Sequence, residues 1–207
     1  MFRKILLGLF TLSVLTGCGQ NYDVTPVSAP QDINVSEHEP NYISTLNAQG
    51  EQTSDLKNIY RFGKVNEFLY RGGLPTDADL QALKQNNFKS VISFRGLGDP
   101  TEAAQVAQEK ATVTGLKMKF FNIQVPFDKP VPDKIIKQFF DTVNNPKNQP
   151  LFVHCKGGRD RTGTLVALYR IKFNRYTPQQ AIEEMKTFTF EPVNYPIFTN
   201  QILNFKP

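Results

Sequence analysis

The stretch Val-His-Cys-Lys-Gly-Gly-Arg-Asp-Arg-Thr-Gly, residues 153–163, decides how the rest of the chain is interpreted. It overlaps the end of an apolar run at residues 150–154 that predicts a buried strand, and it leads into an apolar pattern at residues 161–174 that predicts a helix. A loop in this position exposes backbone N–H groups at a helix N-terminus, where the helix dipole favours negative charge. Gly157 and Gly158 allow those groups to approach one phosphate closely. The sequence therefore predicts a phosphate-binding loop.

Four side chains of this stretch predict chemistry in addition to binding. Cys155 lies where the same field favours the thiolate, which is the attacking form of cysteine. Arg161 can bind two phosphate oxygens through its planar guanidinium group and stabilise the phosphoryl group during transfer. Thr162 is placed to donate a hydrogen bond to the departing sulfur, and His154 is expected to organise the loop. Cleavage of phosphate esters is the predicted reaction.

The pattern His-Cys, five residues, Arg-Thr-Gly, which ends at Gly163, resembles the signature of the cysteine-dependent protein tyrosine phosphatase superfamily. The short chain upstream of it is closer to the compact dual-specificity branch. The resemblance implies a single α/β domain over residues 58–207, with a mixed, largely parallel sheet flanked by helices on both faces. It also implies that the cysteine first takes the phosphoryl group and water then removes it, without a metal or another cofactor.

A phosphatase of this kind also needs an acid to protonate the leaving group, and the resemblance places that acid on a loop upstream of the signature. Residues 125–133 are rich in proline and contain Asp128, in a Pro-Phe-Asp sequence that resembles the acid-bearing loop of the lipid-phosphatase branch. Asp133 is the alternative, although an acidic residue in a first helical turn commonly serves the helix dipole. A third alternative is that this loop supplies no acid.

The variable positions of the signature bear on the substrate. Lys156 and Arg159 are basic, as in phosphoinositide phosphatases of the tumour-suppressor type, and Lys129 adds a third cation beside the predicted acid. Asp160 departs from that pattern, which has glycine there. These residues favour inositol polyphosphates, the substrates of bacterial cysteine phytases, or phosphoinositides. Phosphoproteins are the alternative substrates. The second alternative function is a non-catalytic phosphate-binding module. For the two basic residues in the signature, the alternative to substrate binding is ordinary solvated surface.

Charge is distributed unevenly along the chain, whose formal net charge is +5. Residues 19–57 hold six acidic residues against one lysine, whereas residues 58–207 hold 21 Lys and Arg against 13 Asp and Glu. A basic domain attracts anionic substrates. Nothing in the sequence resembles a nucleic-acid-binding module, so nucleic acid is not an expected partner. The oligomeric state is not predicted.

The N-terminus predicts a location. Two basic residues precede the apolar run at residues 5–15, and Leu-Thr-Gly-Cys follows, which resembles a bacterial lipoprotein signal that ends before Cys18. Residues 1–17 would be removed, Cys18 would carry the lipid, and residues 18–57 would form a polar, acidic tether. The predicted location is the bacterial cell envelope, on the periplasmic side of the outer membrane. An ordinary secretory signal or a short membrane anchor is the alternative.

Cysteine and histidine are too few for other kinds of site. Because Cys18 and Cys155 are the two cysteines, lipidation of the first leaves the second without a disulfide partner. The two histidines, His38 and His154, have no cysteine cluster beside them, so no metal site is predicted.

Hydrophobic periodicity and capping signals predict alternating strands and helices. The predicted strands are residues 59–62, 68–71, 89–94, 118–125 and 151–154. The predicted helices start after Thr76, at Pro100, at residue 132, at Arg161 and after Thr177. Arg95 ends a strand and is expected to brace a loop, with substrate contact as the alternative. Core packing, with a pocket wall as the alternative, is expected of four aromatic residues: Phe188, Phe190, Tyr195 and Phe198.

Overall fold

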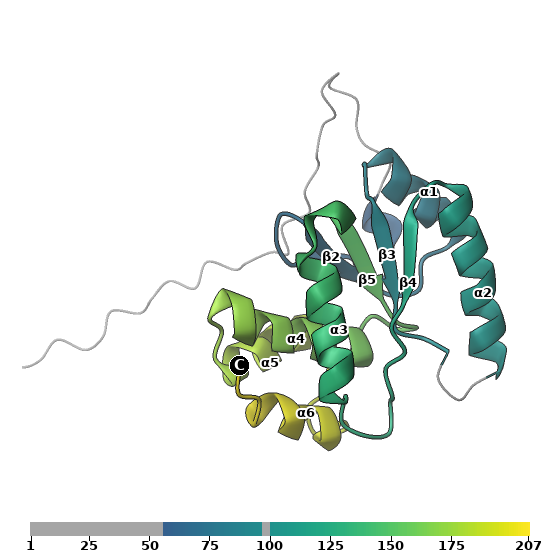
Figure 1. The fold of residues 1–207 in the computed structure, drawn as a ribbon. Helices are drawn as coiled ribbons and strands as arrows, with labels where there is room; N and C mark the ends of the chain where they lie inside the picture. The colour runs from purple at the N-terminus through teal and green to yellow at the C-terminus, as the bar shows by residue number, and fades with distance from the viewer. Residues whose placement is uncertain (1–55, 97–99) are drawn as a thin grey trace, which may run out of the picture. The chain divides into compact units, whose positions relative to one another are not determined.

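The computed structural model describes residues 56–96 and 100–207, which form a sheet with helices on both of its faces (Figure 1). The strand order is β1-β2-β5-β3-β4; β1 runs antiparallel to β2, and the other pairs are parallel. The strands are β1 (Gly63–Lys64), β2 (Leu69–Gly72), β3 (Ser90–Ser93), β4 (Lys119–Asn122) and β5 (Leu151–His154). Since β5 is central, the residue that follows it lies in the middle of the carboxyl edge of the sheet.

Alternating side chains of the strands divide the core into two clusters. Val91 and Phe152 pack with α1 (Asp77–Gln85) and α2 (Pro100–Gly115) on one face. Ile92 and Val153 point to the opposite face and its own helices. Those helices are α3 (Asp133–Asn144), α4 (Asp160–Asn174), α5 (Pro178–Thr187) and α6 (Pro196–Leu203). Two short 3₁₀ turns, Leu56–Asn58 and Pro146–Asn148, complete the described elements. The predicted fold class is confirmed.

Local capping chemistry sets two of the helix starts. Thr76 accepts a hydrogen bond from the Asp79 N–H, and the Asp79 carboxylate accepts one from the Thr76 N–H at 2.8 Å. The same reciprocal pair joins Thr177 and Gln180 at the start of α5. A cap of this kind satisfies two N–H groups that have no partner within the helix. Both helix starts agree with the sequence prediction.

Two element predictions were wrong in detail, and one helix was missed. Residues 59–62 are a turn, because Arg61 adopts a left-handed backbone conformation with φ 52°, which a strand does not allow. The edge strand β4 ends at Asn122, three residues earlier than predicted. The last helix, α6, was not predicted, although Phe198 and Ile202 bury its inner face against the core.

Candidate active site

Cys155 directly follows the buried strand β5, and α4 begins at Asp160, so residues 155–159 form the predicted loop. The Cys155 side chain belongs to the core cluster on the α4 side, and the residue is 3% exposed. Gly158 has φ +68°, and a Cβ atom there would lie 2.5 Å from the Gly72 carbonyl carbon. The loop therefore passes so close to the end of β2 that only glycine fits at this position.

Four consecutive carbonyl groups of the loop each accept a hydrogen bond from a group outside it. His154 Nδ1 lies 3.0 Å from the Cys155 oxygen, and the Leu74 N–H donates to the Lys156 oxygen at 3.0 Å. Arg61 Nη1 donates to the Gly157 oxygen at 2.9 Å, and Arg71 Nη2 donates to the Gly158 oxygen at 2.7 Å.

These bonds orient the N–H groups of the loop. In a planar trans peptide the N–H points away from the carbonyl group that precedes it. Holding the four carbonyls from outside therefore turns the N–H groups of residues 156–159 toward the inside of the loop. Successive N–H groups with this orientation form an anion-binding nest, and the N-terminus of α4 adds its dipole to it. The loop is thus built to bind a phosphate group above Cys155.

Arg61 and Arg71, which hold the two glycine carbonyls, were not recognised from the sequence as site residues. Arg71 is 1% exposed, lies 3.8 Å from the centroid of the Phe188 ring, and has its Nε and Nη1 without hydrogen-bond partners among the described residues. Full burial lowers its pKa to about 10, although the charges of Glu184 and Cys155 oppose this shift. Arg71 therefore places a positive charge beneath the loop. An arginine inside an otherwise apolar strand was the available signal.

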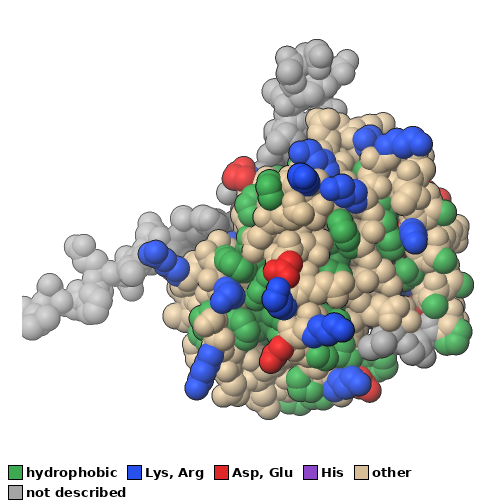
Figure 2. Space-filling view, viewed as in Figure 1, with side chains coloured by type: hydrophobic (Ala, Val, Ile, Leu, Met, Phe, Trp, Pro, Cys, Tyr) green, Lys and Arg blue, Asp and Glu red, His purple; other side chains and the backbone are tan. Residues whose placement is uncertain are grey.

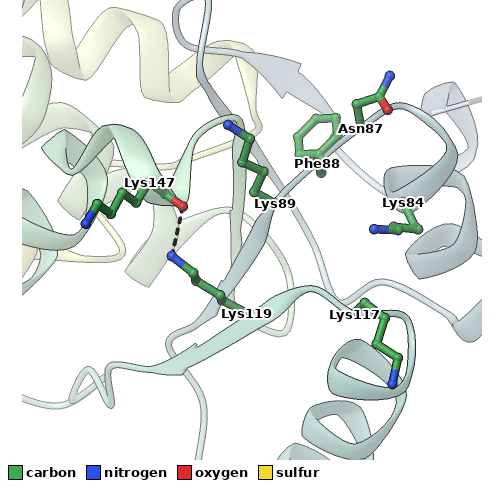
Figure 3. A pocket seen from close by; sticks show the side chains of 7 residues that line it. All are labelled: Lys84, Asn87, Phe88, Lys89, Lys117, Lys119 and Lys147. Carbon is green, nitrogen blue, oxygen red and sulfur yellow. Dashed lines mark hydrogen bonds between the residues drawn. The ribbon is translucent and has the colours of Figure 1, made fainter.

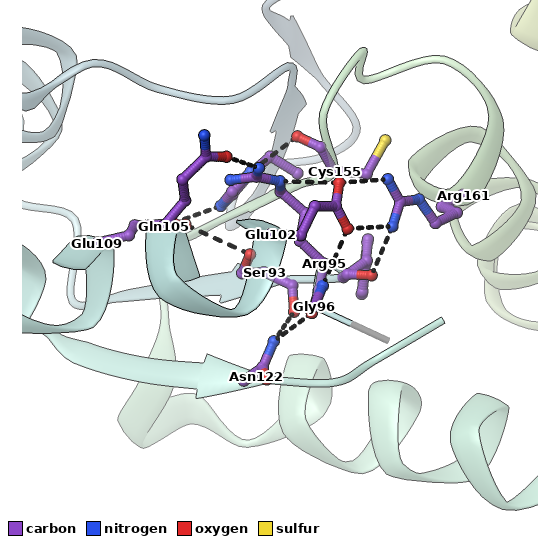
Figure 4. Close-up of polar contacts among 11 residues, drawn as sticks. Ser93, Arg95, Gly96, Glu102, Gln105, Glu109, Asn122, Cys155 and Arg161 are labelled. Atoms are coloured by element: carbon purple, nitrogen blue, oxygen red, sulfur yellow. Dashed lines mark hydrogen bonds and ion pairs between the residues drawn. The ribbon is translucent and has the colours of Figure 1, made fainter. Parts of the chain in front are cut away.

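The Arg161 side chain lies over the same loop and is held by an acidic residue of α2. Its Nη1 and Nη2 donate to the two Glu102 oxygens at 3.2 Å each, and Nη1 also donates to the Phe94 oxygen at 3.4 Å (Figure 4). Burial disfavours the charged guanidinium, but the hydrogen bonds to Glu102 and the charge of Cys155 outweigh it and raise the pKa of Arg161. These contacts leave Nε–H and one Nη2–H on one edge of the planar group, which is the geometry that binds two phosphate oxygens.

Glu102 also binds Arg95, and the two arginines keep it ionised. The Arg95 Nε lies 3.3 Å from Glu102 Oε1, and the Arg95 Nη2 donates to Gln105 (Figure 4). Partial burial disfavours the charged carboxylate, but hydrogen bonds from Arg161 and from the Gly96 N–H lower the pKa of Glu102 to about 2. Arg95 is 1% exposed, and its contacts with Glu102 and Gln105 are the bracing contacts that we expected of it. Glu102 was not recognised from the sequence as a site residue, because an acidic residue in the first turn of a helix commonly serves the helix dipole.

A buried contact between a histidine and a carboxylate lies beside Cys155. His154 Nε2 is 2.6 Å from Glu109 Oε1, and both side chains are at most 5% exposed. Because a carbonyl oxygen only accepts hydrogen bonds, Nδ1 must carry the proton that faces Cys155, and Nε2 faces Glu109. Ser93 Oγ donates to the other Glu109 oxygen at 3.4 Å. This chain fixes the ring of His154 and with it the first carbonyl of the loop, which is the organising contact we expected of His154.

Thr162 differs from the sequence-based expectation. Its hydroxyl is buried and has no hydrogen-bond partner among the described residues, so the predicted bond to the Cys155 sulfur is not formed. A buried hydroxyl left without a partner costs about 1–3 kcal/mol. Gly163, the last signature residue, packs against Met185, where an added Cβ would lie 2.9 Å from Cε.

The predicted substrate-binding residues of the loop differ in their surroundings. Lys156 is exposed, whereas Arg159 is partly buried, donates to Asp160 at 2.9 Å and also binds the Tyr195 hydroxyl. The hydrogen bond with Asp160 is the largest cause that raises the pKa of Arg159. Asp160 thus neutralises part of the charge of Arg159, and Lys156 is the signature cation that faces solvent. Of the four aromatic residues, Phe190 and Phe198 are in the core as expected, while Phe188 and Tyr195 stack on Arg71 and Arg159.

The predicted acid loop is described, but the structure does not join it to Cys155. Asp128 and Lys129 are both exposed and form no hydrogen bond or ion pair with the residues in the described ranges. Asp133 is the first residue of α3 and is exposed. Cys18, the predicted signal and residues 18–55 of the predicted tether lie outside the described residues, and their assignment stays a prediction; the last two tether residues belong to the 3₁₀ turn Leu56–Asn58.

Neither a membrane-spanning helix nor a candidate metal site is found within residues 56–96 and 100–207. Within them, no helix is both long and apolar enough to cross a membrane. No group of three or more His, Cys, Asp or Glu side chains gathers there in a way that could hold a metal ion.

The fold and this site define a class of protein, the cysteine-dependent phosphatases of the dual-specificity type. Residues 40–201 match the family model PTP-NADK, described as a DSP-PTPase phosphatase fused to NAD⁺ kinase. The chain belongs to this family of phosphatases.

Individual relatives agree with the family. A probable tyrosine-protein phosphatase of Dictyostelium discoideum, DG1060, is 31% identical over 127 residues, which cover 61% of this chain and 75% of that protein. Inositol diphosphatase DSP4 of Arabidopsis thaliana is 28% identical over 130 residues, covering 61% of this chain and 63% of that protein. The dual specificity protein phosphatase TpbA of Pseudomonas aeruginosa is 26% identical over 129 residues, covering 62% of this chain and 53% of that protein. The chain thus spans less than two thirds of the second relative and about half of the third.

Solved structures show the same fold. The core catalytic domain of the PP-IP phosphatase SIW14 from S. cerevisiae superposes with a TM-score of 0.58 at 22% identity, covering 70% of this chain and 85% of that one. P. aeruginosa TpbA gives a TM-score of 0.58 at 23% identity, covering 70% and 84%. These likenesses show the fold, and the family match with the named relatives shows that the chain is a phosphoric monoester hydrolase of the protein tyrosine phosphatase type.

Proposed function

We propose that Cys155 attacks the phosphorus of a bound phosphate monoester while Arg161 and the N–H groups of residues 156–159 bind the non-bridging oxygens. The sulfur–phosphorus bond forms as the bond to the leaving oxygen breaks, and Asp128 gives that oxygen a proton. Water then attacks the phosphocysteine, returns a proton to Asp128, and releases phosphate and the Cys155 thiolate. The position of Cys155 beneath the nest of inward N–H groups and beside Arg161 supports this assignment.

Inositol polyphosphates are the substrate class that we favour. The main observation is Lys156, an exposed cation in the loop that binds the reacting phosphate, because a neighbouring phosphate on the same ring would lie within reach of it. Four relatives in two plants and one in Saccharomyces cerevisiae carry the name inositol diphosphatase, which supports the same class. Arg159 contributes less, since Asp160 neutralises part of its charge.

A panel of substrates tests this choice. We expect kcat/KM for inositol hexakisphosphate or a diphosphoinositol phosphate to exceed that for a phosphotyrosine peptide by at least about tenfold, a difference of about 1.4 kcal/mol in transition-state binding. Lys156→Gln should raise KM for the inositol substrate, and Lys172→Gln, an exposed lysine of α4, serves as its charge-matched control. If the peptide is the better substrate, phosphoproteins are the substrates of this enzyme.

Phosphotyrosine proteins are the second candidate. The probable tyrosine-protein phosphatase of D. discoideum is a relative, and a TpbA variant has been solved in complex with pTyr. The same panel decides between the two classes.

The role of Asp128 can be tested through the leaving group. General acid catalysis contributes about 10²–10⁴-fold, and more of it is needed when the leaving oxygen is strongly basic. We expect Asp128→Asn to slow hydrolysis of an alkyl phosphate by about 100-fold or more and that of p-nitrophenyl phosphate much less, because nitrophenolate leaves without a proton. Asp133→Asn is the matched control. Equal losses for both substrates, or a larger loss in the control, would show that Asp128 is not the acid.

A further inference from the structure

Five lysines gather at the end of the sheet opposite Cys155. They line a cavity of about 410 Å³ together with Asn87 and Phe88 (Figure 3). Its lining lysines are Lys84, Lys89, Lys117, Lys119 and Lys147, and no acidic residue of the described part of the chain lines it. Figure 2 shows Lys and Arg side chains gathered over this end of the molecule, above the starts of β3 and β4. We call this cavity the lysine pocket.

The lysines come from separate elements, which the backbone brings together. Lys89 precedes β3 and Lys119 starts β4, and the Lys119 N–H donates to the Lys89 oxygen at 2.9 Å. Lys84 lies in the last turn of α1, Lys117 follows α2, and Lys147 lies in the 3₁₀ turn before β5. The pocket is therefore formed by the amino ends of strands and the carboxyl ends of helices.

One lysine is fixed by the protein, and the others are free to bind. The Lys119 ammonium donates to the Lys147 oxygen at 2.8 Å and to Asn148 Oδ1 at 2.9 Å, and Asn148 is 4% exposed. Within residues 56–96 and 100–207, the ammonium groups of Lys84, Lys89, Lys117 and Lys147 have neither a hydrogen bond nor an ion pair. Phe88 is 4% exposed and gives the pocket a packed wall.

The helix dipole explains only part of this cluster. Lys84 and Lys117 lie at helix C-termini, where a cation is favourable. However, the Asn87 and Lys117 N–H groups already donate to the Lys84 and Thr114 oxygens at 3.0 Å each, which satisfies these terminal carbonyls. Lys89 and Lys119 lie at the starts of strands, so the helix dipole does not explain their position. Four unpaired ammonium groups around one concavity repel one another, and a multivalent anion would relieve that repulsion.

We propose that the lysine pocket is a second, non-catalytic binding site for a compact, soluble molecule that carries several phosphate groups. The volume lies within the range of small-molecule sites, and five of the seven residues that line the cavity are lysines. β3 has four residues and spans roughly 13 Å, so an anion in the pocket is separated from the phosphate above Cys155 by at least the length of the strand. One protein molecule thus binds two phosphorylated molecules at once.

Binding stoichiometry in the full chain tests this site. The probe is inositol hexakisphosphate, the method is titration calorimetry, and the background is Cys155→Ser, which prevents turnover. The pocket variant combines Lys84→Gln, Lys89→Gln and Lys117→Gln and keeps Lys119, whose ammonium bonds to the backbone. The control variant combines Lys110→Gln, Lys172→Gln and Lys206→Gln, three exposed lysines outside the pocket with the same total charge.

We expect the pocket variant to bind one equivalent less, or to bind the second equivalent at least about tenfold more weakly, while the control is unchanged. The affected equivalent should weaken steeply at about 1 M salt, where the Debye length falls to about 3 Å. The proposal is overturned if both variants lose the same affinity, because net charge alone then explains the effect. It is also overturned if the pocket variant keeps both equivalents. If the triple variant does not fold, the single variant Lys89→Glu takes its place in the same comparison.

Two other readouts separate this site from alternatives. With Cys155 intact, hydrolysis of p-nitrophenyl phosphate by the pocket variant should stay within about twofold of the parent chain, whereas a tenfold loss would make the pocket part of the reaction. Binding to phosphatidylcholine vesicles with and without phosphatidylglycerol should be equal in the two variants. If the pocket variant loses binding to the anionic vesicles and keeps both soluble equivalents, the lysines contact a membrane and the proposed ligand is wrong. The expected loss of one bound equivalent in the pocket variant does not depend on whether inositol phosphates are substrates of the enzyme.

Discussion

Replacing Cys155 with serine is expected to lower turnover of p-nitrophenyl phosphate by roughly 10⁴-fold or more. The attacking form of cysteine is the thiolate, and a serine hydroxyl at the same position is a much weaker acid that remains protonated. The nest of N–H groups and Arg161 are unchanged in this variant, so phosphate binding should persist. Steady-state kinetics and a phosphate-binding titration on the same preparation measure the two effects.

Cys18→Ser is the matched control for this experiment, since it removes the other cysteine of the chain. It should leave turnover by the purified protein within about twofold of the parent. Appreciable activity in Cys155→Ser would contradict the phosphocysteine intermediate. Loss of both turnover and phosphate binding would instead indicate that the serine disturbs the loop.

Gly158→Ala is expected to abolish the phosphate site, whereas Gly157→Ala is expected to be tolerated. At Gly158 the backbone has φ +68°, and a Cβ atom would lie 2.5 Å and 2.6 Å from the Gly72 carbonyl carbon and the Gly73 nitrogen. Because the obstacle is backbone, it cannot rotate away. At Gly157 the nearest heavy atom to an added Cβ is the Arg61 Nη1 at 3.8 Å, an ordinary contact distance.

The two alanine variants add the same methyl group one residue apart, so their difference isolates the geometry of Gly158. We expect Gly158→Ala to cost about 2 kcal/mol or more of unfolding free energy, to lower Tm by about 4–8 °C, and to reduce kcat/KM by at least about 100-fold. The large kinetic effect follows because displaced Gly158 and Arg159 N–H groups no longer point at the phosphate. Thermal unfolding and kinetics measure both quantities. Similar behaviour of the two variants would contradict the close approach of the loop to β2.

The support of the loop explains how a short sequence can hold several N–H groups toward one anion. Each of the four carbonyls between Cys155 and Gly158 has a donor outside the loop, and two of these donors are arginines from the chain before α1. Glu109 and Glu102, both from α2, hold His154 and Arg161 in turn. Residues before α1 and residues of α2 therefore position the reacting loop from outside it, and pre-organised donors of this kind stabilise charge without rearrangement.

The sequence by itself determined the chemistry and the class of fold. The order of Cys155, the two glycines and Arg161 between a strand pattern and a helix pattern was sufficient, because a nucleophile, an anion-binding loop and a helix N-terminus are all local features. The capping pairs at Thr76 and Thr177 were predictable for the same reason.

Tertiary structure alone decided which residues support that chemistry. Four residues that support the loop lie 45 to 96 positions from their partners between His154 and Arg161: Arg61, Arg71, Glu102 and Glu109. No spacing in the sequence relates these residues to the loop. Parallel strand order places the end of β2 beside the end of β5, and this contact makes Gly158 obligatory and brings Arg71 beneath the loop. The lysine pocket likewise arises because the strand starts and helix ends that carry its lysines meet at one edge of the sheet. Local patterns encode the reacting groups, whereas their support depends on contacts that exist only after the sheet has assembled.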